Sequence, residues 1–335
     1  MKVLIIGGTG TLSYPLTKLI IANTDMELTL INRGNNLKDI PLDKVNLFKS
    51  NINDKDAIET FMKDKHFDVV INFINFYPQE VTRDIQYFKG KCDQYIFIST
   101  NVVLNHEAYV NIDETVTVGN RMSLYGQNKA LCEKVLHDSK DFPYTIVRPS
   151  HTYSESRFPV SVKGKDTWTI FDRILNEKEI IVHDGGQSIW PITHAFDFAN
   201  LLYSLIGLNS ALYENYHIMN PSIITWDNIY QEIATQLNKP YKPYYIETDI
   251  LSLSSKYNFE EAIKGDKKYS NIFNIDKILE LNKGFEFKYG LKEGVRSFLE
   301  YMEKHPEFKT IDEVFNTWSD DLIEKHKAFK NNLEI

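Results

Sequence analysis

Short runs of valine, isoleucine and other apolar residues alternate with segments of helical pattern through the first half of the chain. Near-continuous apolar runs of this kind predict strands that are buried on both faces, as in a parallel sheet. The predicted strands are 3–6, 27–31, 45–48, 68–73, 95–99 and 145–148. Helices are expected from near Pro15, after the candidate N-cap Asn53, and from Pro78 to Lys89, where Gly90 is placed to end the helix. The alternation predicts a doubly wound α/β fold.

From about residue 150 the rhythm changes to a loop-like segment, 150–166, followed by mostly helical segments at 226–237, 291–304 and 312–330. Strand 180–183 and helix 197–205 are strongly apolar, so we expect both to return to the sheet. A single core rarely grows beyond about 250–300 residues, so a chain of 335 residues predicts two lobes. We assign 1–155 to the sheet domain, with 178–208 returning to it. A smaller, mostly helical lobe, 156–177 and 209–335, is expected over the carboxyl edge of the sheet.

Charge and cysteine content exclude several classes of partner. The chain has 46 acidic and 38 basic side chains, a formal net charge of −8, and no basic stretch that would follow a nucleic-acid backbone. Cys92 and Cys132 have no further ligand nearby at metal-site spacing, which predicts buried free thiols and no metal. No apolar run approaches the roughly 18 residues that a membrane-spanning helix needs. The first predicted strand begins at residue 2, in the stretch that a secretory signal would occupy. We therefore expect a soluble, cytoplasmic protein with no membrane partner.

A glycine turn follows the first strand directly and leads into a helix. In the Rossmann fingerprint one glycine permits the tight turn, a second lets the backbone approach a pyrophosphate, and a third lets the helix sit close to the sheet. Ser13 stands where the third glycine would, which predicts slightly looser packing of that helix. Glycines also close corners that bind no ligand, but the position within a strand–helix–strand unit favours a nicotinamide dinucleotide. The residues expected to hold it here are Gly7, Thr9, Gly10, Thr11 and Leu12.

The residues after the second and third strands are expected to meet the adenosine half of that dinucleotide. NAD-binding chains carry an acidic residue after the second strand, which accepts a hydrogen bond from the ribose 2′-hydroxyl. This chain has Asn32 and Arg33 there, and an arginine can clamp a 2′-phosphate, which favours NADP over NAD. A solvated loop arginine is the alternative. Asn51 and Ile52, after the third strand, are expected to flank the adenine.

A tyrosine and a lysine four residues apart, Tyr125 and Lys129, share one face of a predicted helix. A free tyrosine, with a pKa of about 10, is a poor base at neutral pH, but a neighbouring ammonium group and an oxidised nicotinamide favour its phenolate form. One such pair is more often accidental than functional. Its weight comes from Thr100, which follows the fifth strand at the carboxyl edge of the sheet, where ligands of such sheets bind.

Taken together, these segments resemble the extended short-chain dehydrogenase/reductase superfamily, specifically its NAD-dependent epimerase/dehydratase branch. The motifs that carry the resemblance are Gly7 and Gly10, the strand end Ile98-Ser99-Thr100, the pair Tyr125 and Lys129, the strand Ile146-Val147-Arg148-Pro149, and the later segments Gly185-Gly186-Gln187, His194, Asp197 and Thr225-Trp226. They span most of the chain in matching order.

The resemblance implies a role for each of these residues. Tyr125 would be the general acid/base, Lys129 would lower its pKa while binding the nicotinamide ribose, and Thr100 would hydrogen-bond the reacting oxygen. Phe73 and Pro149 would border the cofactor. The substrate would be a nucleotide-diphosphate sugar bound by the smaller lobe, and the reaction an epimerisation or a ketone reduction. Relatives of this kind often form homodimers.

Two departures from that pattern leave alternatives open. Dehydratases of the branch carry an Asp-Glu pair directly after the strand-end hydroxyl, whereas this chain has Asn101 and Val102, which counts against dehydratase chemistry. The loop after Pro149 lacks the usual Gly-Pro and contains His151, a candidate substrate contact. The alternatives to an enzyme are a non-catalytic or RNA-binding relative and an NADP-sensing regulator. The intact set Thr100, Tyr125 and Lys129 favours the enzyme.

Overall fold

The centre of the molecule is a seven-stranded parallel sheet. The computed structural model describes residues 1–23, 25–35, 37 and 40–332. The strands are β1 (Lys2–Ile6), β2 (Glu27–Asn32), β3 (Asn46–Lys49), β4 (Phe67–Asn72), β5 (Cys92–Ile98), β7 (Tyr144–Pro149) and β11 (Asn215–Ile218). Their order is β3-β2-β1-β4-β5-β7-β11, and every neighbouring pair is parallel. This order reverses direction between β1 and β4, as in doubly wound folds, so the predicted fold class is confirmed.

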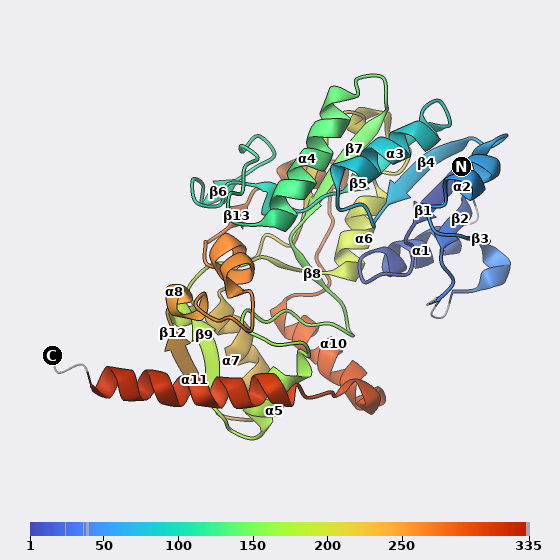
Figure 1. The fold of residues 1–335 in the computed structure, drawn as a ribbon. Coiled ribbons are helices and arrows are strands. Elements are labelled where there is room, and N and C mark those ends of the chain that lie inside the picture. Colours follow the sequence, from blue (N-terminus) through green and yellow to red (C-terminus); the bar gives the residue numbers. More distant parts are fainter. Residues whose placement is uncertain (24, 36, 38–39, 333–335) are drawn as a thin grey trace.

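Helices cover both faces of the sheet (Figure 1). On one face α1 (Ser13–Ala22) packs against α6 (Ala195–Tyr203), and on the other lie α2 (Lys55–Met62), α3 (Pro78–Phe88) and α4 (Leu124–Asp138). Alternate residues of β1 join opposite cores, with Val3 and Ile5 on the α1 side and Leu4 and Ile6 on the α3 side. Successive side chains of a strand point to opposite faces of the sheet, so a strand with apolar residues at every position is buried on both faces. This arrangement explains the sequence pattern.

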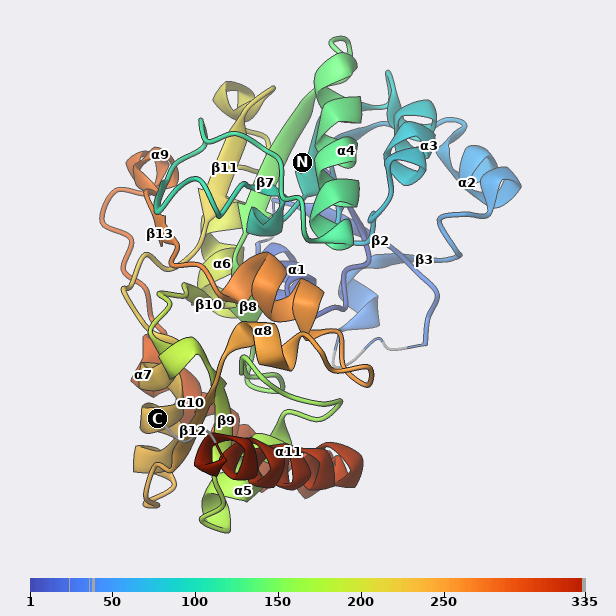
Figure 2. The same ribbon diagram turned by 60° about the vertical axis from the view of Figure 1, so that its left-hand side comes forward.

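A second core lies beyond the carboxyl edge of the sheet and defines what we call the second lobe (Figures 1 and 2). Its elements are α5 (Trp168–Leu175), β9 (Ile180–His183), α7 (Trp226–Gln236), β12 (Pro243–Ile246), α8 (Thr248–Leu251), the π-helix η5 (Glu260–Lys267), α10 (Leu291–Lys304) and α11 (Glu313–Asn331). Stacked Trp190 and Trp226 rings, 5.6 Å apart, belong to this core. None of the helices within the described ranges has the length and apolarity needed to cross a membrane.

Short elements connect the two cores. The pair β8 (His151–Tyr153) and β10 (Ile192–His194) continues from the ends of the sheet, and β6 (Asn111–Ile112) pairs with β13 (Ile272–Phe273). Helix α9 (Asp276–Leu281) follows β13 and packs against β11. The chain therefore crosses between the cores several times after β7.

Two expectations about the second half of the chain are wrong. The strand 180–183 does not return to the sheet, because β9 pairs with β12 and its side chains enter the second core. The sheet gains its seventh strand instead from Asn215–Ile218, within the range 209–335 that we assigned to the smaller lobe. Apolar composition indicates that a strand is buried but does not indicate which core buries it. Helix α6 does return to the sheet, as expected, and packs on α1.

Both cysteines are buried free thiols, as the sequence predicts. Cys92 begins β5 and Cys132 lies on α4, and both contribute to the core on the α3 side of the sheet. Burial raises the pKa of each thiol to about 12. At neutral pH both side chains therefore behave as small apolar groups rather than as nucleophiles.

An ion pair is buried between α4 and the sheet, directly below the strand ends. Arg148 donates from Nε to Glu133 Oε1 (2.9 Å) and from Nη2 to Oε2 (2.6 Å), and each side chain is only 2% exposed. Ser99 Oγ donates to the same Glu133 at 2.6 Å. Glu133 therefore fixes the ends of β5 and β7 relative to α4.

We expect Glu133→Gln to lower the free energy of unfolding by about 3–5 kcal/mol, because the Arg148 charge would stay buried without a counter-charge. Urea unfolding followed by circular dichroism measures the loss. The neighbouring Lys134→Ala breaks only the exposed pair with Asp138 and should cost less than about 1 kcal/mol. Similar losses for the two variants would contradict a structural role for the buried pair.

Candidate active site

The glycine turn after β1 forms the floor of a long hollow. Gly8 sits so close to the sheet that a methyl group there would lie 2.8 Å from Leu30 Cδ2 and 3.1 Å from Thr17 Oγ1. The close approach of helix and sheet is thus found at Gly8. Ser13, expected to loosen this packing, is instead 1% exposed and braces the turn, since its Oγ donates to the Gly7 carbonyl (2.7 Å) and accepts from the Gly10 amide (2.8 Å). Ser13 thus has a bracing role that the sequence did not predict, and the looser packing of the helix stays a prediction.

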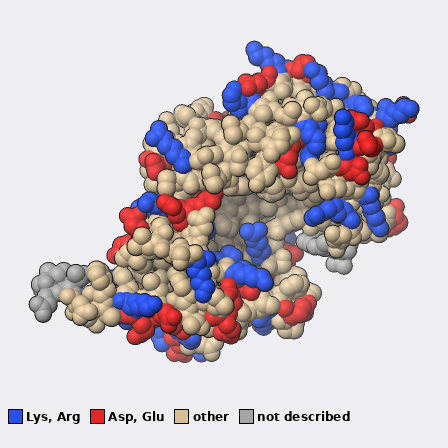
Figure 3. All heavy atoms as spheres, viewed as in Figure 1, with Lys and Arg blue, Asp and Glu red and all other residues tan. Residues whose placement is uncertain are grey.

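Two adjoining cavities extend from this turn, and both are lined by Gly7, Gly10, Ile74 and Phe76. One, of about 550 Å³, continues toward the ends of β2 and β3. The other, of about 520 Å³, continues toward α4 and the second lobe. Figure 3 shows the surface hollowed between the two lobes, with basic side chains beside the hollow. A single elongated ligand placed over the glycine turn would occupy both cavities.

The cavity toward β2 contains the residues predicted for the adenosine half of a dinucleotide. Thr9, Asn32, Arg33, Asn51 and Ile52 all line it. Asn32 is fixed by two hydrogen bonds, since its Nδ2 donates to Thr9 Oγ1 (2.9 Å) and its Oδ1 accepts from the Gly34 amide (2.8 Å). Arg33 is exposed at the rim. The side chain expected to choose between NAD and NADP thus lies at this end of the hollow.

The cavity toward α4 contains the remaining predicted residues. Thr11, Leu12, Phe73, Thr100, Tyr125, Lys129 and Pro149 line it. They come from five segments that are distant in the sequence, and they meet because the carboxyl ends of parallel strands share one edge of the sheet. The structure therefore brings all the predicted site residues into the two cavities, and the roles assigned to them stay predictions.

Tyr125 lies in the first turn of α4, beside Thr100. Ser123 caps this helix by accepting from the Gly126 amide at 3.0 Å. A methyl group at Gly126 would overlap the Val102 carbonyl oxygen, so only glycine lets the helix approach the turn after β5 this closely. Burial raises the pKa of Tyr125 to about 12, and a hydrogen bond with the Thr100 side chain opposes that rise. The phenol and the hydroxyl are thus neighbours at the end of the cavity.

Lys129 is buried one turn further along α4. Its Nζ donates to the carbonyl oxygens of Asn75 and Ile98, both at 2.7 Å, and lies 4.9 Å from the centre of the Phe76 ring. Burial lowers the pKa of this ammonium group to about 8. Two carbonyl dipoles and an aromatic face compensate the buried charge only in part.

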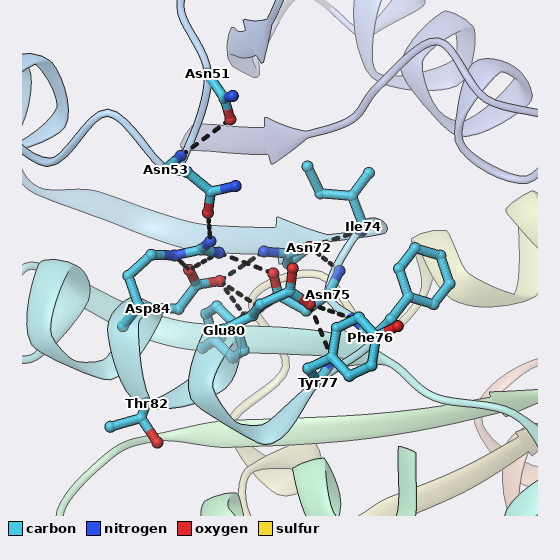
Figure 4. A network of polar contacts seen from close by, with 12 residues as sticks. Asn51, Asn53, Asn72, Ile74, Asn75, Phe76, Tyr77, Glu80, Thr82 and Asp84 are labelled. Carbon is cyan, nitrogen blue, oxygen red and sulfur yellow. Dashed lines mark hydrogen bonds and ion pairs between the residues drawn. The ribbon is translucent and has the colours of Figure 1, made fainter. Parts of the chain in front are cut away.

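Asp84, on α3, organises the loop that holds Lys129 (Figure 4). Its Oδ2 accepts from Asn72 Nδ2 (2.5 Å), Asn75 Nδ2 (2.7 Å) and Tyr95 Oη (2.6 Å), and its Oδ1 accepts from Arg83 Nη2 (2.6 Å). The carboxylate is fully buried, and burial raises its pKa while Arg83 lowers it. The loop is thereby fixed, and with it the Asn75 carbonyl that accepts from Lys129.

The network extends outward on both sides of Asp84. Arg83 also donates to Asn53, whose side chain lines the cavity toward β2. Glu80 accepts from the amides of Phe76 (2.6 Å) and Tyr77 (2.9 Å), which closes the start of α3. Sequence reasoning missed this network, because an aspartate on a helix face carries no signal that it is buried.

The far end of the cavity toward α4 is lined by residues of the connecting segments and the second lobe. They are Asn101, His151, Thr152, Arg157, Trp190 and Asp266. Burial lowers the pKa of His151 well below its usual range, and the nearby Lys267 charge adds to that effect. His151, a candidate from the sequence, is therefore a neutral group facing the cavity. Arg157 and Asp266 were not predicted, since no motif marks them.

Comparison with known proteins identifies the family of the chain. A model of the NAD dependent epimerase/dehydratase family matches residues 3–218, which is more than half of the sequence. The chain belongs to this family. The match runs from β1 to β11 and includes the glycine turn, Thr100, Tyr125 and Lys129. The resemblance seen in the sequence is thus confirmed.

Solved structures share the fold of this family member at low sequence identity. An epimerase from Methanothermobacter thermautotrophicus, 15% identical, superposes with a TM-score of 0.72 over 92% of this chain and 94% of the relative. A dTDP-glucose 4,6-dehydratase from Bacillus anthracis in complex with NAD, 17% identical, has a TM-score of 0.70 over 92% and 98%. The UDP-glucuronic acid 4-epimerase from Bacillus cereus in complex with NAD, 16% identical, also has 0.70, over 91% and 99%. No curated protein sequence matches the chain.

The Lys129 geometry predicts a pH-dependent contribution to stability. Its pKa of about 8 in the folded protein is lower than the roughly 10.4 of an unfolded chain, so the unfolded state binds more protons between these values. The free energy of unfolding of the wild type should therefore rise, relative to that of Lys129→Met, as the pH increases from about 7 to about 10.

Urea unfolding of both proteins across this pH range measures the difference. Lys134→Met, on the same helix but 67% exposed, should differ from the wild type by a constant amount. A constant difference for Lys129→Met would mean that the ammonium group is not held in a desolvated site.

Proposed function

We propose that this protein is an NAD(P)-dependent epimerase or reductase of a nucleotide-diphosphate sugar, with Tyr125 as the acid/base. The observation that carries the proposal is the meeting of Thr100, Tyr125 and Lys129 at the end of a cavity whose floor is the glycine turn. A non-catalytic relative would have no need to combine a buried ammonium group, a phenol and a hydroxyl at one point.

The two adjoining cavities suit a dinucleotide in size and lining. Their combined length covers the glycine turn from the β2 end to α4, and the turn contributes to both. Gly7, Thr9, Gly10, Thr11 and Leu12 would hold the pyrophosphate, Asn32, Arg33, Asn51 and Ile52 the adenosine, and Phe73, Lys129 and Pro149 the nicotinamide half. When bound, the dinucleotide supplies the hydride acceptor in its oxidised form and the hydride donor in its reduced form.

The side chains of the chain itself would handle the proton. The Tyr125 phenol oxygen takes the proton of the substrate hydroxyl in oxidation and returns it in reduction, while the Thr100 hydroxyl hydrogen-bonds the same substrate oxygen. Burial alone disfavours the phenolate. In the proposal, the Lys129 ammonium group, one turn along the same helix, and the oxidised nicotinamide ring would together offset this by favouring a negative charge on the phenol.

The substrate class rests on the relatives and on one departure from them. Structures of similar fold are described as a UDP-glucuronic acid 4-epimerase in complex with UDP-glucuronic acid and NAD, and as a UDP-Glc/GlcNAc 4-epimerase from Campylobacter jejuni. A nucleotide sugar is therefore the proposed substrate. Asn101, which lines the cavity where dehydratases carry an aspartate, supports an epimerase or a reductase over a dehydratase.

Substitution of Tyr125 tests the proposal. Tyr125→Phe should lower kcat by about 10²–10⁴-fold while leaving the Kd for NADH or NADPH unchanged, because one hydroxyl is lost far from the phosphates. Conversion of UDP-glucose, UDP-glucuronic acid and dTDP-glucose measures turnover, with cofactor absorbance following a net oxidation or reduction and chromatographic separation of the two epimers following an epimerisation. Tyr109→Phe is the matched control, since both tyrosines are 38% exposed and Tyr109 lies outside the cavities.

Three outcomes would separate the alternatives. Full activity of Tyr125→Phe would show that the mechanism is wrong. Dinucleotide binding without conversion of any sugar nucleotide would favour an NADP-sensing regulator. Tight, specific RNA binding in a gel shift at physiological salt would favour the RNA-binding relative.

Arg33 provides a test of cofactor choice, for which we propose NADP over NAD. Arg33→Ala should weaken NADPH binding by roughly tenfold or more and leave NADH binding nearly unchanged, since only NADPH carries the 2′-phosphate that the guanidinium would clamp. Fluorescence titration of both dinucleotides measures the two Kd values. Lys44→Ala, which removes an exposed cation outside both cavities, is the control. Equal losses for NADH and NADPH would exclude the clamp.

A further inference from the structure

A π-helix of the second lobe is fastened to the beginning of α4. In η5 (Glu260–Lys267), the Glu261 carboxylate accepts from Ser123 Oγ and from the Tyr125 amide, both at 3.1 Å. The Gly265 carbonyl accepts from Asn120 Nδ2 at 2.8 Å. π-Helical turns are rare and occur frequently at functional sites. The next residue along η5, Asp266, is thereby brought to the cavity that contains Tyr125.

The Asp266 carboxyl group lines this cavity together with Thr100, Asn101 and Tyr125. Its side chain is 14% exposed, and its Oδ1 is buried without a hydrogen-bond partner among the described residues. Asn101 Nδ2, which lies at the same end of the cavity, is likewise buried and unpartnered within that part of the chain. An acceptor and a donor buried without partners in the wall of one cavity are unsatisfied polar groups, which are rare away from functional sites.

His106 lies directly behind Asp266, with its Nε2 3.7 Å from Asp266 Oδ1. The other ring nitrogen, Nδ1, is 2.7 Å from Asn271 Oδ1, and the Asn271 amide group donates to the Tyr269 carbonyl. The oxygen of Asn271 therefore faces the ring, so Nδ1 carries the hydrogen and donates it. Burial lowers the pKa of His106, which keeps the ring neutral. The His106 ring therefore packs against the Asp266 carboxyl group as a neutral group and fixes its position rather than adding a charge.

The charges around Asp266 act in opposite directions. Burial raises its pKa above that of an ordinary carboxyl group, and the adjacent Lys267 ammonium group lowers it. The Lys267 charge is itself disfavoured by burial and by the nearby Lys163 and Arg157. The Asp266 charge in turn raises the pKa of Tyr125. Because its acid form is stabilised, the Asp266 carboxylate is a stronger proton acceptor near neutral pH than a surface carboxylate.

We propose that Asp266 is a further catalytic residue, which removes a proton from, and returns it to, the carbon next to a carbonyl group held by Thr100 and Tyr125. His106 is the positioning residue behind it. The inference rests on the proposed function, which makes a sugar ketone a ligand of this cavity. The proposal places a second acid/base, besides Tyr125, in the second lobe. The strand-end residue Asn101 cannot take this role, because its amide group accepts no proton.

The proton balance of the step involves only the ligand and this chain. Asp266 takes the proton, and the electron pair of the broken C–H bond forms a carbon–carbon double bond. The carbonyl becomes an enolate oxygen, stabilised by hydrogen bonds from Thr100 and Tyr125. Reversal returns a proton from Asp266 to the same carbon and restores the carbonyl. In D₂O the Asp266 acid exchanges its proton with solvent, so the returning atom is deuterium.

Hydrogen exchange into a preformed ketone tests this step apart from hydride transfer. The protein saturated with NADP⁺ is incubated in D₂O with dTDP-4-keto-6-deoxyglucose, and mass spectrometry follows the gain of one mass unit for each exchanged carbon-bound hydrogen. The wild type should accelerate exchange over buffer, and Asp266→Asn should lose about 10²-fold or more of that rate. Glu260→Gln, an exposed change on the same π-helix, should keep it.

Two results would overturn the assignment while leaving the proposed function intact. In one, the wild type exchanges hydrogen no faster than buffer alone does. In the other, Asp266→Asn exchanges hydrogen as fast as the wild type does. Loss of sugar-nucleotide turnover in Tyr125→Phe together with a smaller loss of exchange would support both proposals, since Tyr125 is only one of the groups that hold the enolate oxygen. His106→Gln gives a milder second variant, for which we expect an intermediate exchange rate because Asp266 would lose its oriented partner.

Stability measured against pH gives a readout that needs no ligand. A carboxyl pKa raised by folding stabilises the protein at low pH, and that contribution is lost as the pH rises through the folded pKa. The free energy of unfolding of the wild type, relative to that of Asp266→Asn, should therefore fall between about pH 4 and about pH 7, as the pH rises from the carboxyl pKa of the unfolded chain to that of the folded protein. A pH-independent difference would show that Asp266 is an ordinary ionised carboxylate, and this result too would overturn the proposal.

Discussion

The buried ammonium group of Lys129 joins three segments that surround Thr100 and Tyr125 in the cavity toward α4. Lys129 Nζ donates to the Asn75 and Ile98 carbonyls at 2.7 Å, so helix α4, the loop after β4 and the end of β5 meet at a single point. Both carbonyls accept from a charged donor, and such hydrogen bonds are stronger than those between neutral groups. Asp84 holds the loop and Glu133 holds the strand ends, so both buried carboxylates serve the placement of Lys129. Tyr125 and Thr100 lie on segments fixed by the same contacts.

The sheet could be predicted from the sequence because its strands carry their own signal. Apolar residues at successive positions, as in Val3 to Ile6, indicate burial on both faces, and the alternation with helices indicates parallel pairing. In the second half of the chain, the apolar pattern that marks strands is weaker. Strand β9 is short and apolar and joins the second core, whereas β11, which contains Asn215 and His217, completes the sheet. Their partners are distant in the sequence, and no local pattern specifies them.

The residues of the candidate site likewise fall into those that the sequence predicts and those that it does not. Gly7, Thr100, Tyr125 and Lys129 could be predicted because each lies at a strand end or in the helix that follows one, and the topology gathers those positions. Asp84 and Asp266 could not be predicted from the sequence. Each acts through contacts that only the folded chain creates, such as that between His106 and Asp266. An isolated aspartate gives no sign in the sequence of whether it is solvated or buried.

The contact between η5 and α4 has a consequence for engineering. The Glu261 carboxylate accepts from the Tyr125 amide, so the second lobe supplies a cap to the helix that carries the acid/base. Free amides at the start of a helix need such an acceptor. A chimera that grafts a foreign second lobe onto this sheet domain in order to change its specificity must therefore retain an acceptor at position 261. Otherwise the exchange would disturb the very helix that it was designed to leave alone.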